Sequence, residues 1–219
     1  MEARKLAQMI DHTLLASEAT SADVERLCAE AVELQVGAIC ISPSLLPIAK
    51  GALPSSINVA AVVGFPSGAH SPETKAVEAK QACDHGANEI DMVVNLAFVS
   101  NSNWDAVTSE VATVRAAISA NVVLKVIIES ALWTDQQIIA VCSAAVLGGA
   151  NFVKTSTGFH KSGGASLAAV RLMRKTVGNS IGVKASGGIR TYADAIAMIE
   201  AGANRIGASA SRAILAEAQ

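Results

Sequence analysis

Four apolar segments of the chain each carry an ionisable residue near their centre. The residues are Lys125, Lys154 and Lys184, together with Asp91. Apolar segments of this length are typical of strands buried on both faces of a parallel sheet, where an unpaired charge is strongly unfavourable. Three lysines and an aspartate in such places indicate a chemical site. The segments are 122–129, 151–156, 181–186 and 89–95.

Buried lysines that lie close together favour amine chemistry. An ordinary lysine, with a pKa of about 10.4, is a free amine in only about one molecule in 2,500 at pH 7. Burial and a neighbouring ammonium both lower that pKa, and a shift of about three units, worth about 4 kcal/mol, frees the amine. Such lysines form Schiff bases with carbonyl substrates, and a nearby aspartate can shuttle protons between the intermediates. One lysine would be the nucleophile and another its charged neighbour.

The four residues lie in a chain in which expected strands and helices alternate, eight times over. This alternation implies a parallel sheet, and eight units in 219 residues suit a closed (β/α)8 barrel. We therefore predict one domain over residues 1–219, with a short helix over residues 1–9 before the barrel. The expected strands are 10–15, 37–42, 57–64, 89–95, 122–129, 151–156, 181–186 and 205–209.

Local signals mark where helices begin and end. Thr20, Thr134 and Thr191 have the spacing of helix N-caps, and Ser71 precedes a proline at the first helical position. Gly-Ala pairs at residues 37, 86, 149 and 202 precede strands, and each glycine can end the helix before it. The alternative fold is an open doubly wound sheet, which the absence of G-x-G-x-x-G after the first strand disfavours. The expected helices are 20–35, 72–85, 104–120, 135–147, 164–177, one from 191, and 212–218, with a short helix or turn over 43–50.

Two glycine-containing loops follow the seventh and eighth expected strands, which is the usual phosphate site of this barrel. The first contains Gly187, Gly188 and Arg190, and the second contains Gly207 and Ser209. Glycines let backbone N–H groups approach an anion, and the start of the final helix adds its dipole. The alternatives are that the glycines are only turns and that Arg190 forms a surface salt bridge.

Composition limits the class of protein. The chain is 51% hydrophobic, 16% charged and only 3% aromatic, so its core must consist of Ala, Val, Ile and Leu. A net charge of -2 without a basic block argues against nucleic-acid binding. Four cysteines without a Cys-x-x-Cys pair indicate reduced thiols. No apolar run approaches the roughly 18 residues that a membrane helix needs. The four scattered histidines do not suggest a metal site, and we expect a soluble cytoplasmic protein without a membrane span.

Five strings of the sequence resemble the deoxyribose-phosphate aldolase family, in its short bacterial form. The resemblance implies a class I aldolase that needs no metal or other cofactor. It implies reversible cleavage of 2-deoxy-D-ribose 5-phosphate to D-glyceraldehyde 3-phosphate and acetaldehyde, and a homodimer. The strings are Asp11-His12-Thr13-Leu14, 89–95, 124–129, 152–158 and 183–190, of which Lys-Thr-Ser-Thr-Gly at 154–158 is the most specific.

The resemblance also implies a role for each candidate residue. Lys154 would be the Schiff-base nucleophile, Lys184 the neighbour that lowers its pKa, and Asp91 the acid/base for proton transfer. Lys125 and Asp11 would belong to the supporting charge network. Cys40 corresponds to a cysteine near the substrate, although a core position explains it better. The residues that would hold the phosphate are Gly158, Gly187, Gly188, Arg190, Gly207 and Ser209.

The chain departs from the family pattern in three places. His160 stands where a glycine is common, Ala210 replaces a second serine, and the only tyrosine is Tyr192 rather than a C-terminal one. Lys161 could supply a replacement positive charge for the phosphate. Other interpretations stay open. Each lysine could be structural and paired with Asp91 or Glu129. The protein could also be another phosphosugar enzyme on this barrel, such as an isomerase or a decarboxylating synthase, or a non-enzymatic phosphometabolite-binding protein.

Overall fold

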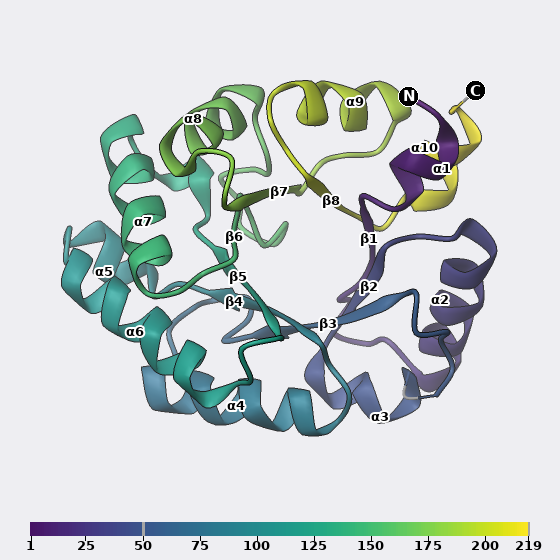
Figure 1. The fold of residues 1–219 in the computed structure, drawn as a ribbon, viewed down its shortest axis with the longest axis horizontal. Coiled ribbons are helices and arrows are strands. Elements are labelled where there is room, and N and C mark those ends of the chain that lie inside the picture. Colours follow the sequence, from purple (N-terminus) through teal and green to yellow (C-terminus); the bar gives the residue numbers. More distant parts are fainter. Residues whose placement is uncertain (50, 219) are drawn as a thin grey trace.

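The computed structural model describes residues 1–49 and 51–218, in which eight parallel strands form a closed barrel (Figure 1). Each strand pairs with the next in the sequence, and β8 pairs with β1. The predicted single-domain (β/α)8 barrel is therefore confirmed, and the open doubly wound sheet is wrong. The strands are β1 Ile10–Leu14, β2 Ala38–Ile41, β3 Asn58–Val63, β4 Glu89–Val93, β5 Val123–Ile127, β6 Phe152–Lys154, β7 Gly182–Ser186 and β8 Arg205–Ala208.

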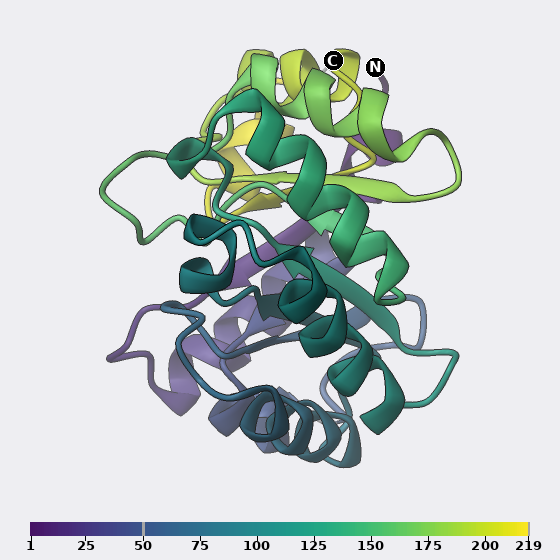
Figure 2. The same cartoon turned by 90° about the vertical axis from the view of Figure 1, so that its left-hand side faces the viewer.

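Helices surround the barrel on all sides, and α1 lies beside α10 so that the two ends of the chain are close together (Figures 1 and 2). The sequence did not predict α5, which begins at an N-cap formed by Asn95. No helix in residues 1–49 and 51–218 combines the length and the hydropathy needed to cross a bilayer. The α-helices are α1 Ala3–Ala7, α2 Ser21–Leu34, α3 Leu46–Ala49, α4 Pro72–Asp84, α5 Leu96–Ser100, α6 Trp104–Ala117, α7 Asp135–Leu147, α8 Leu167–Val177, α9 Tyr192–Glu200 and α10 Ser211–Ala216.

Two short 3-10 helices complete the secondary structure. One, η1 at Pro43–Leu45, runs into α3, and together they form the helix expected over 43–50, except that Lys50 lies outside the described residues. The other, η2 at Ser130–Leu132, follows β5 and was not predicted. Its presence shortens the expected strand over 122–129, because Glu129 leaves the extended conformation before η2 begins.

The predicted helix caps are present. Side chains of Thr20, Thr134 and Thr191 each accept a hydrogen bond from the N–H group three residues later and form a capping box. Ser71 accepts from Thr74 N, and Pro72 follows it inside the helix. Each cap satisfies donors that a helix N-terminus leaves without an intrahelical partner, which fixes where the helix after each strand begins.

Three of the four Gly-Ala pairs end a helix as predicted. Gly86, Gly149 and Gly202 adopt left-handed backbone conformations, with φ of 109°, 97° and 116°. The pair at residue 37 differs, because Gln35 takes the left-handed position with φ of 53°. At Gly37 the constraint is space, since a Cβ atom there would lie 2.3 Å from the carbonyl oxygen of Gln8.

The same three pairs are each followed by an asparagine that ties neighbouring strands together at the start of β4, β6 and β8. Each asparagine donates its backbone N–H to a carbonyl of the preceding strand region and accepts, through Oδ1, an N–H from that region. These bonds fix strand register at the amino end of the barrel, opposite the end where active sites lie. The accepted donors are Val59 N for Asn88 and Leu124 N for Asn151, both at 2.8 Å, and Val183 N for Asn204 at 3.0 Å.

A buried ion pair fixes the other end of β4. Lys75 Nζ on α4 donates to Glu110 Oε1 on α6 at 2.6 Å and to the carbonyls of Gly68 and Val93 at 2.7 Å each. Glu110 Oε2 accepts from Asn95 N at 2.9 Å. Both charged side chains are fully buried. The pair therefore joins the loop after β3 to the carboxyl end of β4.

We predict that Lys75→Met lowers the free energy of unfolding by about 3–5 kcal/mol, because it leaves the Glu110 carboxylate buried without its cation. Lys80→Met on the same helix is the matched control. The Lys80 and Asp84 side chains are 64% and 59% exposed, and an exposed pair of this kind is worth at most about 1 kcal/mol. Denaturant unfolding of both variants measures the difference. Equal losses would show that the buried pair does not hold the end of β4.

Candidate active site

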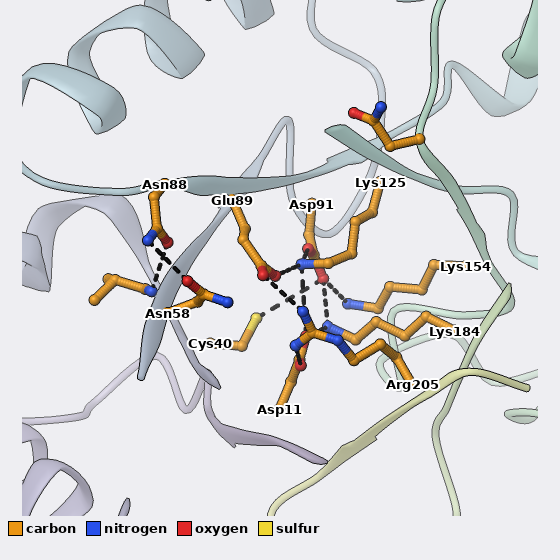
Figure 3. A network of polar contacts seen from close by, with 12 residues as sticks. Asp11, Cys40, Asn58, Asn88, Glu89, Asp91, Lys125, Lys154, Lys184 and Arg205 are labelled. Carbon is orange, nitrogen blue, oxygen red and sulfur yellow. Dashed lines mark hydrogen bonds and ion pairs between the residues drawn. The ribbon is translucent and has the colours of Figure 1, made fainter. Parts of the chain in front are cut away.

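The four residues singled out in the apolar strands converge inside the barrel (Figure 3). Asp91 on β4 is the register partner of Lys125 on β5, and Lys154 on β6 is the partner of Lys184 on β7. Side chains alternate along a strand between the barrel interior and the helix layer. The contacts that the four side chains make with one another show that all of them point to the interior.

Asp91 is the centre of this cluster. Its Oδ1 accepts from Lys125 Nζ at 2.7 Å, and its Oδ2 accepts from the Nζ atoms of Lys154 and Lys184, each also at 2.7 Å. One carboxylate therefore receives three ammonium groups from three successive strands. Lys154 is 3% exposed, and the other three side chains are completely buried.

Three further charges surround the cluster. Asp11 on β1 pairs with Lys184 and Arg205, and it lies 3.5 Å from Lys125 Nζ. Glu89 lies 2.5 Å from Lys125 Nζ and 2.7 Å from Arg205 Nη2. Asp11 was predicted to belong to this network, whereas Glu89 and Arg205 were missed. Glu89 stands two positions before Asp91 on the same strand, so the period of two was a signal that could have found it.

The sequence left open whether Lys125 pairs with Asp91 or with Glu129. Lys125 contacts Asp91, Glu89 and Asp11. Glu129 instead accepts hydrogen bonds from Thr157 in the loop after β6. Lys125 thus lies in the same ion network as the other two lysines.

The network does not balance in charge among the residues that the structure describes. Four side chains are cations when protonated, and only three are carboxylates. Lys154 has one ion-pair partner, Asp91, whereas each of the other cations has at least two. Lys154 is therefore the cation whose proton is held least strongly. The cations are Lys125, Lys154, Lys184 and Arg205, and the carboxylates are Asp11, Glu89 and Asp91.

The pKa values follow this imbalance. Burial lowers the pKa of Lys154, the Lys184 ammonium lowers it further, and the Asp91 carboxylate only partly opposes them. Burial also disfavours the charged form of Lys184, but the carboxylates of Asp11 and Asp91 outweigh it and raise its pKa. The pKa of Lys125 is raised in the same way against burial, chiefly by Asp91. One lysine of the three thus loses its proton more easily than an ordinary lysine, beside two that hold theirs more firmly.

Asp91 and Asp11 are held as carboxylates. Burial alone would raise the pKa of Asp91, but the ammonium groups of Lys125, Lys154 and Lys184 outweigh it and keep that pKa well below its ordinary value. The pKa of Asp11 is likewise lowered against burial, chiefly by Lys184. Asp91 can therefore accept a proton only when the positive charge around it decreases.

A cavity of about 570 Å³ opens above Lys154 at the carboxyl ends of the strands. All six residues expected at a phosphate site line it. Gly187 has a φ of 88°, and a Cβ atom there would lie 2.9 Å from the Cα of Gly164 and 3.4 Å from that of Gly158, so larger residues cannot occupy it. The six residues are Gly158, Gly187, Gly188, Arg190, Gly207 and Ser209.

Arg190 lies at the rim of this cavity. Its backbone N–H donates to Asp194 Oδ2 at 3.2 Å, and its guanidinium forms no ion pair with any residue that the structure describes. The structure therefore does not support the alternative of a surface salt bridge for Arg190. The guanidinium is an exposed positive charge beside the glycine-lined loops.

Several lining residues carried no signal in the sequence. The loop after β1 forms one wall of the cavity, although nothing in its composition marks it as part of a site. Thr13, Leu14, Thr157, Ser186 and Ile189 belong to the strings that resemble the family, which could have identified them. The additional lining residues are Thr13, Leu14, Leu15, Ala16, Ser17, Glu18, Thr157, Phe159, Ser186, Ile189 and Ala208.

The residues at which this chain differs from the family pattern do not line the cavity. His160 and Lys161 do not line it, and Lys161 is exposed. Ser211 cannot replace the serine missing at Ala210, because it is buried and its Oγ is bonded to His12 Nδ1 at 2.9 Å. Cys40 does not line the cavity either. It is a completely buried core residue, and its Sγ lies 3.9 Å from Asp91 Oδ2.

Comparisons with known proteins agree with this geometry. Residues 5–217 match the model of the DeoC/LacD family aldolases. The chain is 54% identical to the deoxyribose-phosphate aldolases of Kocuria rhizophila and Corynebacterium diphtheriae, over 96% and 97% of this chain and 95% and 96% of theirs. The solved tetrameric deoxyribose phosphate aldolase of Aeropyrum pernix superposes with a TM-score of 0.89 at 34% identity, covering 98% of this chain and 91% of that one. The chain with this lysine-rich barrel interior therefore belongs to the DeoC/LacD aldolase family.

Proposed function

We propose that this protein is a class I deoxyribose-phosphate aldolase. It cleaves 2-deoxy-D-ribose 5-phosphate reversibly to D-glyceraldehyde 3-phosphate and acetaldehyde, through a Schiff base on Lys154. The observation that carries the proposal is a lysine of lowered pKa at the floor of a cavity whose walls are glycine-rich loops. The names of relatives at 54% identity over almost the whole chain support the substrate.

The reaction begins with the neutral amine of Lys154. Its Nζ attacks the aldehyde carbon C1 of the open-chain sugar and gives a carbinolamine, which loses water to form an imine. Asp91, 2.7 Å from that Nζ, is the proposed group that accepts and returns protons in these steps. Loss of the Lys154 charge removes one of the three ammonium groups around Asp91, which makes this carboxylate a better base.

The imine then serves as the electron sink for carbon–carbon cleavage. The C3 hydroxyl loses its proton and the C2–C3 bond breaks. The electron pair of that bond forms the C1–C2 double bond of an enamine whose nitrogen is Lys154 Nζ. D-glyceraldehyde 3-phosphate leaves as the aldehyde product. Protonation of the enamine at C2 and hydrolysis of the resulting imine release acetaldehyde and restore Lys154.

Lys184 is proposed to tune this chemistry without taking part in bond formation. Its raised pKa keeps it charged, and its ammonium lowers the pKa of Lys154. Lys125 and Asp11 are proposed to hold the network, since Lys125 contacts Asp91 and Asp11 contacts Lys184. The substrate phosphate would lie at the other end of the cavity, against the loops that contain Gly158, Gly187 and Gly188.

The competing functions fit the site less well. An isomerase or decarboxylating synthase on the same barrel relies on a carboxylate or histidine base and has no use for a lysine of lowered pKa. A phosphometabolite-binding protein would use the glycine-rich loops but not the ion network that makes Lys154 nucleophilic. The homodimer and the cytoplasmic location stay predictions from the sequence, and the Aeropyrum pernix relative is described as a tetramer.

We predict that Lys154→Ala abolishes cleavage of 2-deoxy-D-ribose 5-phosphate, because no amine remains to form the imine. Asp91→Asn should lower kcat by about 10²–10⁴-fold through loss of the proton carrier. Acetaldehyde release, coupled to NADH oxidation by alcohol dehydrogenase, measures both. Lys161→Ala removes an exposed lysine outside the cavity and should leave the rate unchanged. Measurable turnover by folded Lys154→Ala would contradict the imine mechanism.

We also predict that Lys184→Met moves the acidic limb of the pH profile of kcat/KM to higher pH. This limb reports the deprotonation of Lys154 in the free enzyme. The Lys184 ammonium lowers the pKa of Lys154, so its removal raises that pKa and requires a higher pH for activity. Lys184→Arg retains the charge and should keep the limb near its original position. A limb that moves to lower pH, or stays fixed, in Lys184→Met would refute the tuning role.

A further inference from the structure

We propose that Glu129 is a positioning residue that sets the phosphate end of the cavity by holding Thr157. The inference rests on the proposed function, because it assigns a role within the same site. Glu129 is 1% exposed and lies two residues after the end of β5, the strand before the one that carries Lys154. No part of the imine mechanism uses its carboxylate.

Within the described part of the chain, every hydrogen bond to the Glu129 side chain comes from Thr157. Thr157 Oγ1 donates to Oε2 at 2.7 Å, and Thr157 N is shared between the two carboxylate oxygens at 3.3 Å each. In residues 1–49 and 51–218, no lysine or arginine forms an ion pair with Glu129. A buried carboxylate without a cation is costly. A buried carboxylate at this position therefore calls for a reason, and the one hydrogen-bond partner that the described residues give it lies on the loop that lines the cavity.

The backbone at Glu129 is also unfavourable for its residue type. Its φ of 54° and ψ of 57° lie in the left-handed region, which glycine adopts freely and glutamate rarely does. On either side of it, Ile128 N donates to Lys154 O at 2.9 Å and Ser130 N donates to Thr155 O at 2.7 Å. The left-handed residue thus stands between two bonds to the segment that carries Lys154. Glycine would satisfy the backbone there, but it could not reach Thr157.

The consequence of these contacts lies at Thr157 and Gly158, both of which line the cavity. Because Thr157 N points to Glu129, it is not a donor for a bound anion, and Thr157 Oγ1 accepts from Phe159 N at 3.1 Å. Gly158, with φ of 83°, follows directly and lies against Gly187 of the next loop. Holding Thr157 therefore fixes the spacing between the two loops at which the phosphate is proposed to bind.

Lys154 is positioned by other means. It lies within β6, which pairs with β5 and β7, and its Nζ is fixed by Asp91. Loss of the Glu129 carboxylate should therefore disturb recognition of the phosphate while imine formation continues. A residue that only stabilised the fold would affect substrates with and without a phosphate to the same extent.

The test compares kcat/KM for 2-deoxy-D-ribose 5-phosphate with kcat/KM for unphosphorylated 2-deoxy-D-ribose. In Glu129→Gly, which suits the left-handed backbone but lacks the carboxylate, we expect the preference for the phosphate ester to fall by about ten- to a hundredfold. The value for 2-deoxy-D-ribose should remain that of the wild type. Glu129→Gln retains an acceptor oxygen for Thr157 and should keep most of the preference.

Glu129→Asn is the second variant, because asparagine tolerates the left-handed region but its side chain is too short to reach Thr157 in the same way. It should reproduce the loss seen with glycine. A wild-type preference that survives in both variants, or an equal loss on both sugars, would overturn the inference alone. A wild-type protein that cleaves neither sugar would overturn the proposed function and the inference with it.

Discussion

Among the residues that the structure describes, the ion network inside this barrel has four basic side chains and only three carboxylates, and the rest of the site depends on that excess. The basic side chains surround Asp11, Glu89 and Asp91, and all of these residues are buried except Arg205, whose side chain is 15% exposed. Low polarity strengthens every ion pair and makes an uncompensated charge expensive. The least paired of the cations, Lys154, is the one that can most easily lose its proton. The charges around Lys154 thus favour it as the proposed nucleophile.

Such a network is possible only because the backbone around it is held firmly. Parallel register brings Asp91 beside Lys125 and Lys154 beside Lys184, so four strands deliver their side chains to one point. The three asparagines at the starts of β4, β6 and β8 fix that register at the amino end. At the carboxyl end, the buried pair of Lys75 and Glu110 closes the loop after β3 onto β4. A slip of one residue in any of these strands would turn its charged side chain out of the barrel.

Much of this arrangement could be predicted from the sequence, because its signals are local. Apolar runs interrupted by lysine marked the strands, and alternation with helices implied the barrel. Glu89 and Arg205 were missed because a charged residue at the start of a strand looks like a loop boundary. The strand over 122–129 was drawn too long, since a pattern of residue types does not reveal the left-handed backbone at Glu129. Residues 13–18 form a wall of the cavity only because β8 pairs with β1. A short stretch of sequence does not reveal such a long-range pairing.

Trapping the proposed imine is the most direct test of whether Lys154 is the nucleophile. The protein is incubated with acetaldehyde and borohydride, digested, and its peptides are examined by mass spectrometry. We predict a reduced ethyl adduct on Lys154, at a pH where Lys125 and Lys184 remain charged and unmodified. In Lys154→Ala we expect no adduct at that site. An adduct on Lys125 or Lys184 in preference to Lys154 would contradict the charge-selection argument. No adduct on any lysine, in a protein that still binds 2-deoxy-D-ribose 5-phosphate, would contradict the imine mechanism itself.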